Sequence, residues 1–182
     1  DGPLVMGSIA QRNFMGKGQR VSLYGQLGGK RTDAVLEFVE PYFFDRNLIF
    51  GLTLFSQDRE YDTFEQENQG GIIRFGKPLT DQVTVSLGYR LEGTELKDVT
   101  PWYSSVFPNT ELFADFVTSS ILPFVSYDTR DNYADPGSGF RNTLECEVAG
   151  LGGDSDFFKI SGDVRYYWTV PETVLPVRRR VV

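Results

Sequence analysis

Apolar and polar residues alternate with a period of two over long stretches of this sequence. The clearest stretch runs from Val83 to Glu92, where every second residue is large and apolar and the residues between are polar or glycine. Successive side chains of a β-strand point to opposite sides, so each such stretch predicts a strand with one apolar and one polar face. Helical periodicity is nearly absent. The chain is therefore expected to be all-β.

Nine segments follow this pattern, and no helical crossover long enough to make the sheet parallel lies between them. The predicted strands are residues 6–14, 20–27, 32–41, 48–57, 69–78, 82–92, 119–127, 141–148 and 158–168. Strands joined without crossovers run antiparallel, so the prediction is one antiparallel meander. At 182 residues the chain is expected to form a single domain.

The two faces of the predicted sheet carry different residues at mid-strand. The polar face is expected to hold Arg74, Arg90, Glu92, Glu145, Glu147, Asp163 and Arg165. The apolar face is expected to hold Val83, Val85, Leu87, Leu144, Val148, Ile160 and Val164. The acidic and basic residues of the polar face predict a cross-strand charge network, with Asp163 and Arg165 facing Glu145 and Glu147 from the next strand. Cys146 lies on the apolar face and is interpreted as a small hydrophobic residue.

The connections form two series that alternate along the chain. Short turns are expected around residues 15–18, 44–47, 80–82, 128–139 and 171–176, and more variable loops around 28–31, 58–67, 97–118 and 151–156. Aromatic residues gather near the short turns, and the predicted girdle consists of Phe14, Tyr42, Phe43, Phe75, Tyr127, Tyr166 and Trp168. Short turns at one end, longer loops at the other and an aromatic girdle are typical of an outer-membrane β-barrel.

A soluble β-sandwich would show the same alternation and is the main alternative. The predicted strands are about 9–13 residues long, which matches the ~9–11 residues that cross a bilayer at a tilt and exceeds the usual ~5–6. Length therefore favours a transmembrane barrel, with the polar face toward its lumen and the apolar face toward lipid.

Composition narrows the possible functions. The sequence has no histidine and one cysteine, which excludes histidine-based catalysis, His-ligated zinc and a disulfide framework. A net charge of −7 argues against a nucleic-acid partner. We therefore expect no enzyme and no cofactor.

The acidic stretch "YDTRDNYADPGSGFRNTLECEVAG" (Tyr127–Gly150) could be a metal site or a hairpin turn. The spacing of Asp128, Asp131 and Asp135 differs from that of a calcium-binding EF-hand loop. Pro136 and the two glycines that follow are typical turn residues. A turn is therefore predicted, and the carboxylates of the following strand are expected to serve the charge network rather than acid–base catalysis.

Three stretches taken together resemble a known family. "GSIAQRNFMGKGQRVSL" (Gly7–Leu23), "EFVEPYFFDRNLIFGLTLF" (Glu37–Phe55) and "VSYDTRDNYADPGSGFRNTLECEVAG" (Val125–Gly150) resemble the barrel of BamA-like outer-membrane protein assembly factors, the bacterial surface-antigen superfamily. The resemblance covers essentially the whole chain. It implies an antiparallel transmembrane β-barrel, located in the outer membrane of a Gram-negative bacterium, that inserts other outer-membrane proteins.

The resemblance also implies that the chain is one segment of a larger barrel domain. Family members carry polypeptide-transport (POTRA) domains before a sixteen-stranded barrel, and residues 1–182 would supply about strands 2–10, with the short turns in the periplasm. The implied partners are outer-membrane lipid, client outer-membrane proteins and, through POTRA domains outside this sequence, the lipoproteins of the assembly complex.

Some features of the family have no counterpart in this sequence. The V-R-G-F/Y motif and the two seam strands are absent, so no residue here inherits their roles. A related translocation-assembly barrel (TamA-like), a passive porin and, last, a soluble sandwich binding module stay open as alternatives. The outermost strands, Met6–Phe14 and Phe157–Trp168, would leave unpaired backbone groups, which we expect further strands or a second copy to satisfy.

Overall fold

A computed structural model describes residues 2–98, 115–169 and 180–181. Ten antiparallel strands follow one another in a single sheet, in chain order, so each strand pairs with its neighbour in the sequence. The strands are β1 (Leu4–Phe14), β2 (Gln19–Gly28), β3 (Arg31–Glu40), β4 (Ile49–Glu60), β5 (Glu65–Pro78), β6 (Val83–Lys97), β7 (Phe116–Asp128), β8 (Gly139–Gly153), β9 (Phe158–Thr169) and β10 (Arg180–Val181). The predicted meander and all nine predicted strands are confirmed.

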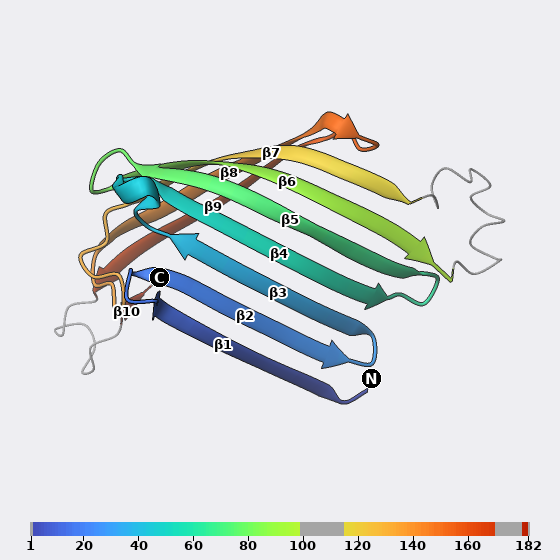
Figure 1. Cartoon of the computed structure of the whole chain (residues 1–182). Helices are drawn as coiled ribbons and strands as arrows, with labels where there is room; N and C mark the ends of the chain where they lie inside the picture. The colour runs from blue at the N-terminus through green and yellow to red at the C-terminus, as the bar shows by residue number, and fades with distance from the viewer. Residues whose placement is uncertain (1, 99–114, 170–179, 182) are drawn as a thin grey trace.

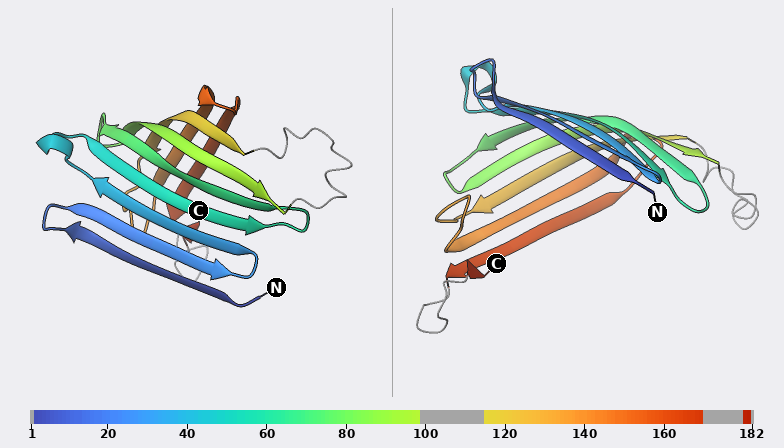
Figure 2. Two further views of the ribbon diagram at one scale, coloured as in Figure 1. Left: turned by 45° about the vertical axis from the view of Figure 1, so that its right-hand side comes forward. Right: turned by 90° about the horizontal axis from the view of Figure 1, so that it is seen from below.

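The sheet is one curved layer, as Figure 1 shows. The strands from β3 to β6 form its front in that view, and the sheet then turns so that β8 and β9 lie behind them; the view from below in Figure 2 shows the open trough that results. No second sheet packs against this layer within the described residues, so the sandwich alternative is wrong. The described part of the chain also contains no helix long and apolar enough to span a bilayer.

The two ends of the sheet carry different connections. We call the end with residues 15–18, 41–48, 79–82 and 129–138 the turn end, and the end with residues 29–30, 61–64 and 154–157 the loop end. The predicted contrast in length is wrong for most of them: residues 29–30 form a two-residue connection, whereas residues 41–48 and 129–138 are longer. The predicted turn at 171–176 and most of the predicted loop at 97–118 lie outside the described residues.

The strands at the loop end are longer than the sequence pattern suggested. The segment 58–67, expected to be a loop, instead continues the β4–β5 ladder, with Asp58 opposite Glu67 and Glu60 opposite Glu65. Polar residues on both faces obscured the alternation there, although backbone pairing does not depend on side-chain polarity. The strands β1–β9 span 10 to 15 residues each, which is the length needed to cross a bilayer at a tilt.

The register of the strands sorts their side chains into two faces. Residues directly opposite each other in an antiparallel pair lie on the same face. In one set of residues, Arg74 on β5 lies opposite Gly88 on β6, which lies opposite Leu122 on β7. In the other set, Ile73, Tyr89 and Ile121 lie opposite one another on the same three strands. The first set forms the concave face, because its side chains reach one another across intervening strands. The second set forms the outer face.

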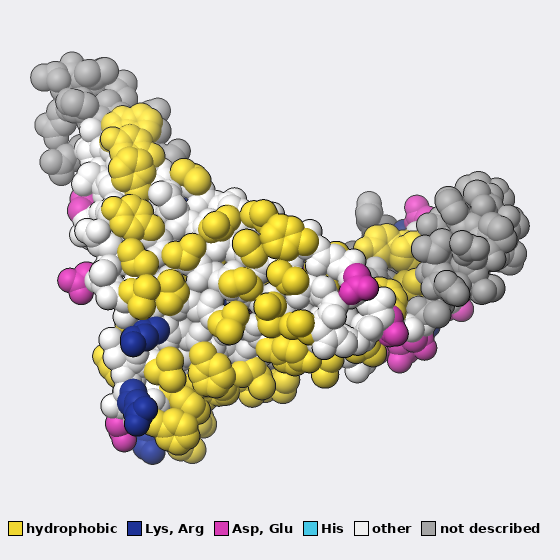
Figure 3. All heavy atoms as spheres, turned by 90° about the horizontal axis from the view of Figure 1, so that it is seen from above, with side chains coloured by type: hydrophobic (Ala, Val, Ile, Leu, Met, Phe, Trp, Pro, Cys, Tyr) yellow, Lys and Arg dark blue, Asp and Glu magenta, His cyan; other side chains and the backbone are white. Residues whose placement is uncertain are grey.

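Burial on these two faces is the reverse of that in a water-soluble protein. Most of the described residues that are buried and polar lie on the concave face, including Asp33, Ser120 and Glu147. Large apolar side chains of the outer face, such as Leu87 and Val164, are exposed. Figure 3 shows apolar atoms spread over the outside of the curved sheet and acidic groups gathered toward the loop end. Such a surface suits a surrounding of lipid.

Candidate functional site: the charged network on the concave face

The central part of the concave face holds an ion pair that spans several strands. The guanidinium of Arg74 on β5 donates a hydrogen bond to Glu145 on β8, with 2.9 Å between Nη2 and Oε2. Two strands, β6 and β7, lie between these residues, so only the curvature of the sheet brings them together. The same guanidinium donates to the Ser86 hydroxyl at 3.3 Å and lies 5.9 Å from the centre of the Phe124 ring.

Gly88 makes room for this crossing. It lies directly opposite Arg74, and a Cβ atom at Gly88 would come within 3.6 Å of the Arg74 guanidinium carbon and 3.4 Å of the Leu122 Cβ. These are ordinary van der Waals distances, so a methyl group would fit at Gly88 and would lie directly against the Arg74 guanidinium. Glycine within a strand often marks such a close approach.

A second ion pair lies deeper in the trough. Arg90 on β6 donates from Nη1 to Oε1 of Glu147 on β8, with 3.1 Å between the atoms, and its distance to Oε2 of Glu92 is 3.9 Å. The Ser120 hydroxyl on β7, between the two strands, donates to the same Glu147 oxygen at 2.8 Å. Ser120 is fully buried and Glu147 is nearly so. Removing one charge from such a pair leaves the other buried without a partner, which is strongly destabilising.

The network links β5 to β8 through side chains as well as through the backbone. Arg74, Arg90, Glu92, Glu145 and Glu147 all share the concave face, as predicted, and four of them pair across the sheet. These contacts hold the curvature of the central strands, because a flatter sheet would pull each arginine away from its carboxylate. The two ion pairs therefore connect β5 with β8 and β6 with β8.

One part of the predicted network is wrong. Asp163 and Arg165 on β9 share the concave face with the others but do not pair with Glu145 or Glu147. Instead they pair with each other, with 2.9 Å between Arg165 Nε and Asp163 Oδ1. The register places Asp163 opposite Thr143 and Arg165 opposite Arg141, so neither lies opposite a carboxylate of β8. Residues two positions apart on a strand share a face, which lets the two side chains pair with each other.

A further polar cluster near the loop end was missed by the sequence analysis. On the concave face, Arg31 ion-pairs with the buried Asp33 at 2.5 Å and lies directly opposite Arg59. The Arg59 Nε atom is buried and has no hydrogen-bond partner within the described part of the chain. The predicted strands began after Arg31 and ended before Arg59. Extending the alternation by two residues at each end would have found the cluster.

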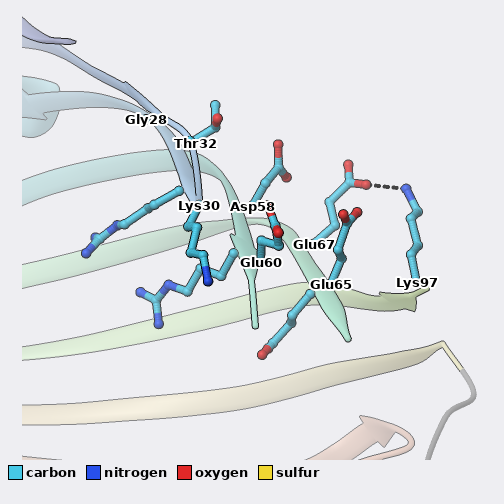
Figure 4. A pocket seen from close by; sticks show the side chains of 12 residues that line it. Gly28, Lys30, Thr32, Asp58, Glu60, Glu65, Glu67 and Lys97 are labelled. Carbon is cyan, nitrogen blue, oxygen red and sulfur yellow. Dashed lines mark hydrogen bonds and ion pairs between the residues drawn. The ribbon is translucent and has the colours of Figure 1, made fainter. Parts of the chain in front are cut away.

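Outside this cluster, carboxylates and lysines gather at the loop end on the outer face. Figure 4 shows Lys30, Asp58, Glu60, Glu65, Glu67 and Lys97 around one small cavity. Lys97 ion-pairs with Glu67 and with Glu95, the latter at 3.2 Å. Asp58, Glu67 and Glu95 lie opposite one another on three neighbouring strands, an arrangement that Lys97 offsets. Within the described residues, no group of three or more acidic or cysteine side chains is arranged to hold a metal ion.

The acidic stretch at the turn end is a hairpin turn, as predicted. Arg130 makes a two-pronged ion pair with Asp128, with distances of 2.9 and 2.7 Å. Asp131 accepts hydrogen bonds from the backbone N–H groups of Gly137 and Ser138 at 2.8 and 3.1 Å, and these donors lower the pKa of its carboxyl group. The carboxylates are thus occupied within the turn.

A glycine closes this turn. Gly139 has φ of +113°, and a Cβ atom there would collide with the Thr129 carbonyl group. Only glycine adopts such a backbone conformation without strain. The turn chemistry identified in the sequence therefore explains this stretch without a ligand.

The predicted apolar positions all share the outer face, and five of the seven predicted girdle residues can be placed by ring contacts or register. The apolar set pairs among itself, for example Val85 with Val125 and Val148 with Phe158. At the turn end, Phe43 stacks on Phe50, which contacts Phe75, and Tyr166 stacks on Trp168. Tyr127 lies opposite Val83 on the outer face. Phe14 and Tyr42 are exposed beside the same end. Their contact with a membrane interface stays a prediction.

Comparisons with known proteins agree with the fold. The profile of the Omp85 superfamily domain matches residues 13–181. The chain is 31% identical over 179 residues to the outer membrane protein assembly factor BamA of Nitratidesulfovibrio vulgaris, covering 97% of this chain and 22% of that protein. It also resembles, with a TM-score of 0.73 and 18% identity, the crystal structure of BamA from Haemophilus ducreyi lacking POTRA domains 1–3, covering 91% of this chain and 35% of that one. The chain thus spans less than a quarter of the first protein and about a third of the second.

Proposed function

Because the chain belongs to the Omp85 superfamily, we propose that it forms part of an outer-membrane β-barrel that assembles and inserts outer-membrane proteins. Family membership confirms the resemblance found in the sequence. It places the chain in the outer membrane of a Gram-negative bacterium and sets aside the passive porin and the soluble sandwich module.

The observation that carries this proposal is the reversed burial of the two faces. Exposed apolar side chains on the outer face match a lipid surrounding, and buried charges on the concave face match a lumen lined by polar groups. The strands are long enough to cross the bilayer, and the turn end carries aromatic residues of the kind that lie at membrane interfaces. We assign the turn end to the periplasm by analogy with the family.

In the proposed protein, this segment forms a braced wall, by which we mean a part of the barrel whose curvature is held by ion pairs between its strands. The ion pairs from Arg74 to Glu145 and from Arg90 to Glu147 hold four strands at a set curvature. Insertion of a client needs a part of the barrel that opens, and it also needs a wall that does not open with it. No covalent step or cofactor enters this role. The proposed partners are outer-membrane lipid, client proteins and, through periplasmic POTRA domains, the lipoproteins of an assembly complex.

A segment exchange tests the proposal. Residues 1–182 would replace the aligned segment of the Nitratidesulfovibrio vulgaris relative, and the chimera would be reconstituted in liposomes with an unfolded client barrel. We expect the chimera to accelerate client folding well above empty liposomes. A matched chimera carrying Arg74→Met and Arg90→Met tests whether the braced wall is required.

The outcomes separate clearly. Heat-modifiable migration on gels reports whether each chimera has folded. A folded chimera without activity contradicts the proposed function of this segment. A chimera that cannot fold contradicts the proposal that these strands form an equivalent wall.

A further inference from the structure

The outer face contains an apolar groove between β5 and β8, close to the turn end. Its volume is about 510 Å³, within the ~300–1,000 Å³ range of small-molecule sites. The lining side chains that point outward include Phe75, Leu87, Pro123, Leu144 and Cys146. Apolar groups thus form nearly the whole wall of the groove.

Pro123 explains why the sheet is hollowed at this place. Proline has no backbone N–H, and in the middle of a sheet it removes a hydrogen bond of the ladder. The pairing of β7 with β8 is interrupted at Leu122 and Pro123, and the flanking register places Pro123 opposite Cys146. Both are small for an outer-face position, while Leu87 and Leu144 rise beside them.

One cation lies at the turn-end limit of the groove. Lys77 belongs to its lining and is the last residue but one of β5. Its ammonium group makes no ion pair or hydrogen bond with any described residue. Figure 3 shows basic side chains at the turn end, at the edge of the apolar surface. The groove therefore runs from a free positive charge into the apolar part of the outer face.

We propose that this groove binds one glycerophospholipid with an anionic headgroup. Its phosphate contacts the Lys77 ammonium group, and one acyl chain lies along Pro123 and Cys146. The inference rests on the proposed membrane orientation, in which the outer face contacts acyl chains and the turn end lies at the headgroups. Charge complementarity selects the anionic headgroup, and the apolar wall selects the chain.

Cys146 offers a direct measurement because it is the only cysteine in the sequence. The chain would be folded into bilayers of phosphatidylcholine alone or of phosphatidylcholine with phosphatidylglycerol, and a membrane-permeant thiol reagent would be added. We expect phosphatidylglycerol to slow the labelling of Cys146. Lys77→Glu should reduce this selectivity by about fivefold, and Lys30→Glu, at the loop end, should leave it unchanged.

Retained lipid provides the second measurement. After extraction in mild detergent, native mass spectrometry should find one phosphatidylglycerol on the wild-type chain and none on Cys146→Phe, whose ring fills the groove. Gly25→Phe is the matched control, because Gly25 lies on the outer face of β2 with nothing within 4 Å of its Cβ position. This variant should retain the lipid.

Several results would overturn the inference. These are equal labelling in both bilayers, lipid retention by Cys146→Phe, or retention of lipid A in place of phosphatidylglycerol when both are offered. Insertion is checked separately by the β-strand signal in circular dichroism. Because the outermost strands leave unpaired backbone groups, insertion is judged on the chimera with the Nitratidesulfovibrio vulgaris relative. A chimera that does not insert contradicts the proposed outer-membrane role, whereas an inserted chimera that retains no lipid contradicts the groove alone.

Discussion

Glu147 and Leu144 lie three positions apart on β8 and on opposite faces of the sheet. Glu147 is 5% exposed, whereas Leu144 is 45% exposed. The contrast extends over the sheet: the concave face buries ion pairs that reach across strands, and the outer face exposes apolar side chains that contact only their neighbours. A folded protein in water would show the opposite distribution.

The two faces are therefore stabilised in different ways. The outer face contributes little packing within the chain, so its stabilisation depends on what surrounds it. The concave face carries much of its own stabilisation, because its central ion pairs join residues of the same chain. Substitutions on the two faces should therefore change the free energy of unfolding by different amounts.

The largest effect is expected from placing a charge on each face of one strand. Leu54 on the outer face and Thr53 on the concave face are adjacent at the middle of β4. Leu54→Arg should reduce the free energy of unfolding by about 2–4 kcal/mol, because the charge would enter lipid near the midplane. Thr53→Arg should reduce it by less than about 1 kcal/mol, because the new guanidinium would stay hydrated and would ion-pair with Glu37, which lies opposite on β3. A urea titration of the chain folded in lipid vesicles measures both, and equal losses would contradict the assignment of the faces.

A smaller loss is expected from breaking the deepest ion pair. Glu147→Gln should reduce the free energy of unfolding by about 1.5–3 kcal/mol, since Arg90 loses its charged acceptor. The double variant Arg90→Met with Glu147→Leu should be more stable than Glu147→Gln, because Arg90 is removed together with Glu147, its nearest carboxylate; the loss that remains includes the longer ion pair of Arg90 with Glu92. The same vesicle titration applies. Strictly additive losses would show that the two residues are not coupled.

Much of the fold could be predicted because alternation with a period of two indicates on which face of the sheet each side chain lies. Once Val85 is placed on one face, Leu87 and Ser86 follow from strand geometry alone. The pairing of strands follows as well, since short connections force neighbours in the sequence to be neighbours in the sheet.

The partners within the network could not be predicted in the same way. Arg74 and Glu145 are 71 positions apart, and they meet across two intervening strands because the sheet curves. Alternation specifies the face of a side chain but contains no information on curvature. The wrong pairing predicted for Asp163 and Arg165 has another cause: alternation does not specify the register between β8 and β9, which places Thr143 and Arg141 opposite them. The ends of β4 and β5 were missed because polar residues occupy both faces there.

A weaker effect should follow from a polar contact within the apolar part of the outer face. The Tyr89 hydroxyl lies 2.9 Å from that of Ser119, which is 3% exposed. Tyr89→Phe leaves the serine without this partner and should reduce the free energy of unfolding by about 0.6 kcal/mol, the average for such contacts in membranes. Tyr127→Phe is the control, since its hydroxyl makes no hydrogen bond with a described residue. A loss as large as that of Glu147→Gln would show that the outer face is stabilised from within after all.

The smallest effect concerns the turn of residues 129–138, which lies beyond both faces. The backbone N–H groups of Gly137 and Ser138 lower the pKa of the Asp131 carboxyl below its value in the unfolded chain. Folded protein therefore binds this proton less readily than unfolded protein does, and the contribution to stability is fully present above the unfolded pKa of about 3.9. It is lost as the pH falls through the lower, folded pKa. Hydrogen exchange of the Gly137 and Ser138 amides, corrected for intrinsic rates, should show reduced protection over that window. Asp131→Asn should remove the pH dependence and leave the amides of β8 near Glu147 protected as before; a turn whose protection does not change with pH would contradict the role given to Asp131.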